Sequence, residues 1–318
     1  MNASPTQQRA PGRFSPARIR RGVSSRLTTY VGGVQAILPK LIYGNSAGFR
    51  NNREPVRQLR EFQEEFARRG NAVPGEPYAS AARSLRENGY LVMERRYAGP
   101  EFEAMRARYA ELMEDPDRSV ATPNGATRFI VEPVAGIPEL RHLLTEELER
   151  TLVAYYGTYF RIEGVRAWRN HHVPSVSMTD DVFSNTFHCD AFPVTGLRLF
   201  VYFNDGVNRE TGAFRFHDKR NTKRIIRSPG YFRRNLLSRS VKQRLLDPQQ
   251  LHFLEGDAGA SMLCNVQECL HAAGVPREGS HRDILQLLIA PSNEPYRERG
   301  ELFDRIPADR EVLAMRGA

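Results

Sequence analysis

His188 and Asp190 are the first residues in this chain whose types and spacing suggest chemistry. They stand two positions apart in the apolar, aromatic stretch from residue 184 to residue 193. On a β-strand, side chains two positions apart point to the same face, so both can reach one metal ion while Cys189 points away. Two histidines and one carboxylate suit a divalent first-row metal and leave positions open for chemistry. A structural pair has the same H-x-D pattern, so we look for a third ligand.

His271 and Arg282 extend this pattern further along the chain. His271 precedes the turn-forming stretch 274–280, which allows the chain to return it to the same place. Arg282 begins the apolar strand 282–289 and shares a face with Ile284, so its side chain points inward. A buried guanidinium needs an anionic partner, because an unpaired buried charge is costly. Its planar fork fits a carboxylate.

The four residues, with the segments TGLRLFVYFND, ETGAF and EGD between them, resemble the phytanoyl-CoA dioxygenase-like iron(II)- and 2-oxoglutarate-dependent oxygenases. The resemblance covers about residues 78–292. It implies a jelly roll in which His188, Asp190 and His271 hold Fe(II) and Arg282 binds the distal carboxylate of 2-oxoglutarate. With O2 as the second cosubstrate, it implies hydroxylation of a small organic substrate and release of succinate and CO2.

Other residues depart from the family pattern or add candidates to it. Ala273 stands where a serine is often found, so a hydroxyl contact to 2-oxoglutarate is missing and the pocket is expected to be unusual. Arg198 and Tyr202 share one face of the strand after the motif, and are tentative contacts of cosubstrate or substrate. The pair His171-His172, at a strand end, lines the pocket or is simply exposed.

The elements that position these residues change in character along the chain. The first half predicts helices that alternate with two strands, and the second half predicts short strands separated by turn residues. The predicted helices are Glu54–Arg69, Ala79–Glu87, Pro100–Met113 and Ile137–Tyr156, and the predicted strands are 90–93, 158–168, 195–204, 213–216, 260–265 and 282–290. We therefore expect a mainly β fold with flanking helices (α+β), built on a double-stranded β-helix of the cupin-like, jelly-roll type.

Four segments follow from the changes in composition. Residues 1–53 form a basic N-terminal segment that is disordered or weakly amphipathic, and residues 54–77 form a helical arm and linker. Residues 78–292 form the catalytic jelly roll, and residues 293–318 are a C-terminal extension.

The net charge of +9 is concentrated at the N-terminus. Residues 1–53 hold nine basic residues and no acid, whereas the rest of the chain balances 37 basic against 37 acidic residues. A basic tail can bind nucleic acid, anionic lipid or protein, and residues 1–43 suggest weak association with a membrane surface. A second basic run, residues 218–244, is either a solvated face or a lid that steers an anionic substrate.

The amino-acid composition excludes several classes of protein. No apolar run is long enough to cross a bilayer, and three cysteines without a C-x-x-C pair indicate neither a disulfide framework nor a zinc ribbon. These features favour a reducing, cytoplasmic location. No nucleic-acid-binding motif is present. Two alternatives remain, a non-catalytic jelly-roll module recruited to nucleic acid or anionic lipid by its basic tail, and a metal-dependent cupin isomerase that needs neither Arg282 nor O2.

Overall fold

The computed structural model describes residues 49–93, 97–174, 185–190, 193–226, 248–304 and 306–316. The predicted membrane-surface segment 1–43 and most of the second basic run lie outside these residues. In the described part of the chain, no helix is both long enough and apolar enough to cross a membrane.

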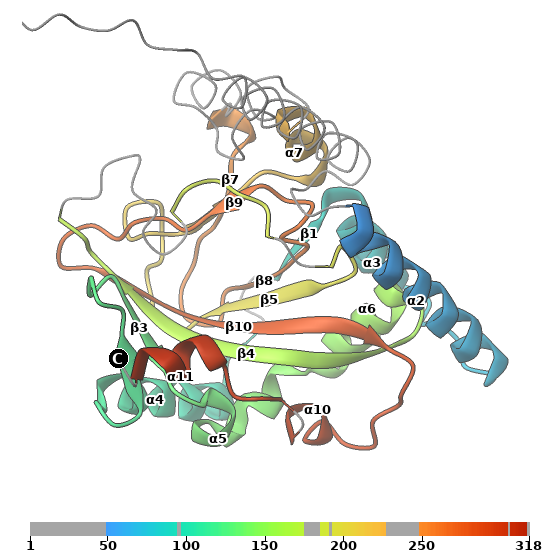
Figure 1. Ribbon diagram of the computed structural model, residues 1–318, viewed down its shortest axis with the longest axis horizontal. Coiled ribbons are helices and arrows are strands. Elements are labelled where there is room, and N and C mark those ends of the chain that lie inside the picture. Colours follow the sequence, from blue (N-terminus) through green and yellow to red (C-terminus); the bar gives the residue numbers. More distant parts are fainter. Residues whose placement is uncertain are drawn as a thin grey trace, which may run out of the picture.

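Two antiparallel sheets make up the body of the protein (Figure 1). The larger sheet has the order β1-β8-β5-β10-β4-β3-β2 and the smaller has the order β7-β6-β9. The strands are β1 (Tyr90–Met93), β2 (Ser119–Ala121), β3 (Thr127–Ile130), β4 (Tyr159–His171), β5 (Leu197–Tyr202), β6 (Phe214–Phe216), β7 (His252–Leu254), β8 (Ser261–Cys264), β9 (His271–Ala272) and β10 (His281–Ser292).

Helices cover the face of the larger sheet that points away from the smaller sheet. In Figure 1, α4, α5, α10 and α11 lie beneath the larger sheet, and β7 and β9 lie above it. The helical segments are α2 (Phe49–Arg68), α3 (Tyr78–Asn88), α4 (Pro100–Glu114), α5 (Pro133–Gly136), η1 (Pro138–Leu143), α6 (Glu146–Tyr156), α7 (Lys219–Ile226), η2 (Pro248–Gln250), α10 (Glu301–Asp304) and α11 (Arg310–Arg316).

Strand β5 shows how the two layers are filled. Leu197, Leu199 and Val201 point into the core shared with the helices, whereas Phe200 and Tyr202 point into the core between the sheets. Because successive side chains on a strand alternate between faces, Arg198 also points between the sheets. The sequence thus places a charged side chain in the interior of the jelly roll.

Several predicted boundaries differ from the structure. The predicted helix Ile137–Tyr156 is wrong as a single helix, because η1 ends at Leu143 and α6 begins at Glu146. Thr145 caps α6, its side chain accepting a hydrogen bond of 3.3 Å from the backbone N–H of Leu148. Helix α2 begins at Phe49, so the predicted segment boundary after residue 53 falls inside a helix. Strand β1 occupies the predicted residues.

Candidate metal centre

His188 and Asp190 lie on an extended segment that pairs with the chain around His271. The backbones of His188 and His271 exchange two hydrogen bonds of 2.9 Å, and the N–H of Asp190 donates to the carbonyl of Val266 at 3.1 Å. Nε2 of His188 is 3.2 Å from Oδ1 of Asp190, and Nε2 of His271 is 3.5 Å from the same oxygen. One ligand atom from each residue lies within 4.8 Å of the others. The structure therefore brings together the three residues proposed as ligands.

The histidine rings are oriented by backbone carbonyl groups. Nδ1 of His188 is 2.7 Å from the carbonyl oxygen of Thr186, and Nδ1 of His271 is 3.0 Å from that of Cys269. A carbonyl oxygen only accepts, so each Nδ1 carries the hydrogen and each neutral ring has its lone pair on Nε2. Both lone pairs then face an oxygen of Asp190. Three acceptors this close repel one another unless a cation or a proton lies between them, and the N,N,O set suits a divalent first-row metal.

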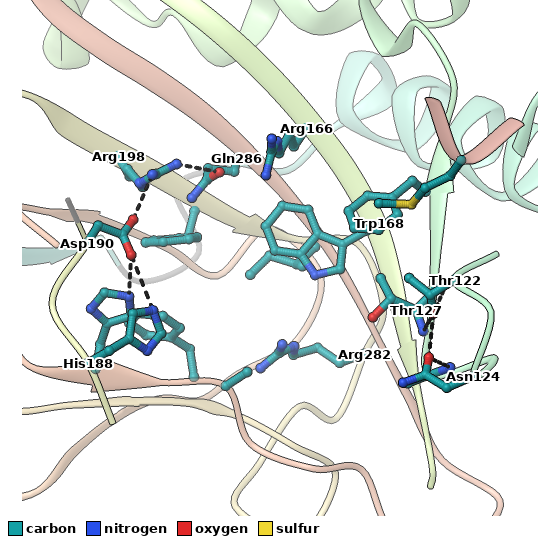
Figure 2. A pocket seen from close by; sticks show the side chains of 18 of the residues that line it. Thr122, Asn124, Thr127, Arg166, Trp168, His188, Asp190, Arg198, Arg282 and Gln286 are labelled. Carbon is teal, nitrogen blue, oxygen red and sulfur yellow. Dashed lines mark hydrogen bonds and ion pairs between the residues drawn. The ribbon is translucent and has the colours of Figure 1, made fainter. Parts of the chain in front are cut away.

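Asp190 uses its second oxygen to bind Arg198 (Figure 2). Nη2 of Arg198 donates to Oδ2 of Asp190 at 2.7 Å, and Nη1 donates to Oε1 of Gln286 at 2.8 Å. Burial raises the pKa of Asp190, but the neighbouring histidines and the charge of Arg198 lower it more. The pKa of Asp190 is thus well below its usual value, and the carboxylate is ionised at neutral pH.

A cavity of about 580 Å³ opens in front of these residues. His188, Asp190, His271, Arg198 and Arg282 line it, as the sequence suggested for four of them and tentatively for Arg198. Sequence reasoning missed several other lining residues, which come from β3, from β4, from the turn between β2 and β3, and from α11. They include Thr122, Asn124, Thr127, Phe129, Arg166, Trp168 and Met315.

Arg282 is fully buried and forms no ion pair with any residue that the structure describes. Its side chain is 1% exposed, and burial lowers the pKa of the guanidinium. Nη1 donates to the carbonyl of Gly212 at 2.6 Å and Nη2 donates to Oδ1 of Asn170, whereas Nε has no hydrogen-bond partner among the described residues. A guanidinium beside a cavity, without an ion pair among the described residues, can bind a carboxylate.

Gly212 is required for this arrangement. Its φ is +92°, and a Cβ at this position would lie 2.9 Å from the backbone nitrogen of Pro276. A larger residue would therefore displace either the turn before β6 or the segment between β9 and β10. The carbonyl of Gly212 is one of the two groups that hold Arg282.

The structure corrects the predicted role of Tyr202 as a tentative contact of cosubstrate or substrate. It shares the inward face of β5 with Arg198, but it is fully buried and is not among the described residues that line the cavity. Its hydroxyl donates to the carbonyl of Leu254 at 2.9 Å and accepts from the N–H of Phe214 at 2.9 Å. The hydroxyl thus joins the two sheets and does not reach the candidate metal centre.

His171, His172 and Cys189 do not form part of the candidate metal centre. His171 and His172 do not line the cavity, and Nδ1 of His172 lies 2.9 Å from the carbonyl oxygen of Pro276. Cys189 is buried on the other side of its segment, and burial raises the pKa of its thiol. Ala273 lines the cavity and contributes only a methyl group.

Comparison with known proteins identifies the fold. No family model and no curated protein matches the sequence. Among solved structures, the non-heme alpha ketoglutarate dependent epimerase SnoN from nogalamycin biosynthesis is similar, with 18% identity, a TM-score of 0.50, and coverage of 72% of this chain and 89% of that one. EctD from S. alaskensis, solved with 2-oxoglutarate and 5-hydroxyectoine, has 15% identity, a TM-score of 0.50, and coverage of 69% and 77%.

At these identities the likeness concerns the fold. The predicted class, a mainly β jelly roll with flanking helices, is confirmed. Membership of the phytanoyl-CoA dioxygenase-like family in particular stays a prediction. The chain has the fold of SnoN and EctD, with a His-Asp-His centre in its cavity.

Proposed function

We propose that this protein is an iron(II)- and 2-oxoglutarate-dependent oxygenase that hydroxylates a small organic substrate, with O2 as second cosubstrate and succinate and CO2 as coproducts. The observation that carries the proposal is the convergence of two histidine lone pairs and one carboxylate oxygen beside the buried Arg282. A purely structural histidine-aspartate cluster has no need of such a guanidinium. Bound iron supplies the oxygen chemistry, and the protein supplies geometry and orientation.

The residues of the centre have separate roles in this proposal. His188, Asp190 and His271 hold the metal, and Arg198 keeps Asp190 ionised and turned so that one oxygen faces the histidines. Arg282 binds the distal carboxylate of 2-oxoglutarate with its fork, and the anion offsets a buried charge that has no ion pair among the described residues. The cavity volume of about 580 Å³ lies within the usual range for small-molecule sites.

The proposal predicts that His188→Ala abolishes metal binding and Arg282→Gln does not. Loss of a charge-assisted hydrogen bond costs about 1.5–3 kcal/mol, so Arg282→Gln should weaken 2-oxoglutarate binding by about 10- to 100-fold. Anaerobic titration with Co(II), followed by 2-oxoglutarate, measures both steps by visible absorption. His142→Ala changes an exposed histidine outside the cavity and serves as the control.

Turnover is measured separately, as succinate released from iron-loaded enzyme in the presence of metabolite mixtures. Products are screened for the gain of one oxygen, and also for no change of mass, because SnoN, which has the same fold, is an epimerase. Binding of neither metal nor 2-oxoglutarate would overturn the proposal. Metal binding without 2-oxoglutarate binding would instead favour a metal-dependent isomerase.

A further inference from the structure

Three arginines are among the described residues that line the cavity, and two of them already have acidic partners. Arg198 binds Asp190. Arg166, on β4, donates through Nε to Asp309 and through Nη2 to Glu311 at 2.7 Å. Only Arg282 has no acidic partner among the described residues, and under the proposed function its charge is offset by 2-oxoglutarate. The substrate therefore meets no uncompensated cation among the described lining residues.

Apart from the arginines and the metal-site residues, the described residues that line the cavity are apolar or neutral. Phe129, Trp168, Ile284 and Met315 supply apolar surface. Several of the polar groups nearby already bind one another. Thr122 donates to Oδ1 of Asn124 at 2.7 Å, and the hydroxyl of Thr127 accepts from the amide of Asn170 at 3.0 Å. A charged group placed here would lose its hydration without gaining an ion pair, which disfavours it strongly.

Helix α11 forms the outer part of this wall. Val312 is buried against the body of the protein, and Met315, three residues later on the same face, reaches the cavity. Leu313 points away and is 38% exposed. Figure 2 shows Trp168 on the side of the cavity away from Asp190 and His188.

We propose that the substrate of this enzyme is an uncharged, mainly apolar molecule that sits between Trp168 and helix α11, with Met315 as a residue that determines its size. The inference rests on the proposed function in one respect, the assignment of Arg282 to the cosubstrate. It differs from the anionic substrate suggested by the basic run 218–244, most of which lies outside the described residues. Among the described lining residues near Trp168, Arg166 already binds two carboxylates and Arg282 is assigned to the cosubstrate.

Trp168 provides the readout, since it is the only tryptophan in the chain and lies in the cavity wall. N-Phenyl-1-naphthylamine and 8-anilino-1-naphthalenesulfonate share one ring skeleton and differ by a sulfonate. Both absorb where tryptophan emits, so binding in the cavity quenches Trp168. With Zn(II) and saturating 2-oxoglutarate present, we expect the neutral probe to bind at least about ten-fold more tightly than the anionic one. Equal or tighter binding of the sulfonate would overturn the inference.

Two substitutions in helix α11 test where the neutral probe binds. Met315→Ala should weaken binding of the neutral probe several-fold, through lost apolar contact, and Leu313→Ala should leave it unchanged. Equal effects of the two variants would contradict the role of Met315. Both side chains lie on one short helix, so a general loss of α11 would appear in both variants.

A further variant separates this inference from the proposed function. Arg282→Gln lacks the cation assigned to the cosubstrate, so the two probes can be compared in it without metal or 2-oxoglutarate. Preference for the neutral probe in this variant supports the substrate class even if the wild-type protein binds no 2-oxoglutarate. Loss of the preference there overturns the substrate class while leaving metal and 2-oxoglutarate binding to stand on their own measurements.

Discussion

Asp190 is held by two different sets of partners, one at each carboxylate oxygen. Oδ1 faces the two histidines and Oδ2 accepts from Arg198, which Gln286 fixes in turn. A carboxylate held in this way offers one oxygen to a metal and cannot easily rotate to offer both. Arg198 is thus a positioning residue, since it acts on the metal through Asp190.

Arg198→Lys tests this role of the guanidinium. Lysine keeps the charge but cannot bind Asp190 and Gln286 with a planar fork, so we expect metal affinity to fall by about ten-fold or more. Co(II) titration measures the affinity, and the visible spectrum of bound Co(II) reports the changed geometry. Arg161→Lys, on a half-exposed arginine of β4 outside the cavity, should alter neither. An unchanged spectrum and affinity in Arg198→Lys would show that Asp190 does not depend on the fork.

The convergence of the residues in the candidate metal centre could be predicted because local rules govern their placement. The two-residue spacing of His188 and Asp190, the turn after His271 and the inward face of Arg282 are all visible in the sequence. Trp168 and Met315 could not be predicted as neighbours, because β4 and α11 meet only in the folded protein. Tyr202 was misassigned because a shared strand face does not distinguish the end near the metal from the end near β7.

Among the elements, α11 depends most clearly on a single residue. Asp309 caps the helix, with Oδ1 accepting from the N–H groups of Glu311 at 3.0 Å and Val312 at 3.4 Å, and its Oδ2 accepts from Arg166. A helix of seven residues is not stable by itself, so its attachment decides whether it forms. The wall of the cavity therefore depends on Asp309.

Asp309→Ala should release α11 without affecting the sheets. Loss of a cap together with an ion pair costs about 1 kcal/mol or more, so amide hydrogen exchange in residues 310–316 should rise by about five-fold or more. Glu311→Ala removes only the other carboxylate of the ion pair, which is 73% exposed, and should have a much smaller effect. Exchange in β10 is the internal reference. If the two variants exchange at the same rate, Asp309 does not anchor the helix.

The accuracy of the predicted elements depended on the sequence signals at their ends. Strand β1 was predicted at its observed residues because Gly89 ends the preceding helix in a left-handed conformation, with φ of +83°. Strands β2, β3 and β7 have only three or four residues and were missed. Such strands are defined by their partners in the sheet, as β3 is by β4, and carry too little periodicity of their own.

At the scale of the whole molecule, His217 connects the parts that carry the metal ligands. Its side chain is 1% exposed, its ring centroid lies 5.7 Å from that of Phe187, and its backbone N–H donates to the carbonyl of Leu270 at 2.9 Å. Phe187 and Leu270 directly precede His188 and His271 in the chain. Burial lowers the pKa of His217 from 6.5 to about 4. A charge on this ring would therefore destabilise the packing behind both ligands.

This pKa predicts how stability depends on pH. The folded value of about 4 lies below the unfolded value of 6.5, so the unfolded chain binds more protons between these limits. The contribution of His217 is fully present above pH 6.5 and is lost as the pH falls towards 4, by about 1–3 kcal/mol. Urea unfolding of metal-free protein at pH 7 and pH 4.5 should show a smaller loss of stability in His217→Gln than in wild type. His142→Gln, at an exposed site, should retain the wild-type dependence. If His217→Gln retains it too, the ring is already charged in the folded state, and the two ligand-bearing segments do not depend on its neutrality.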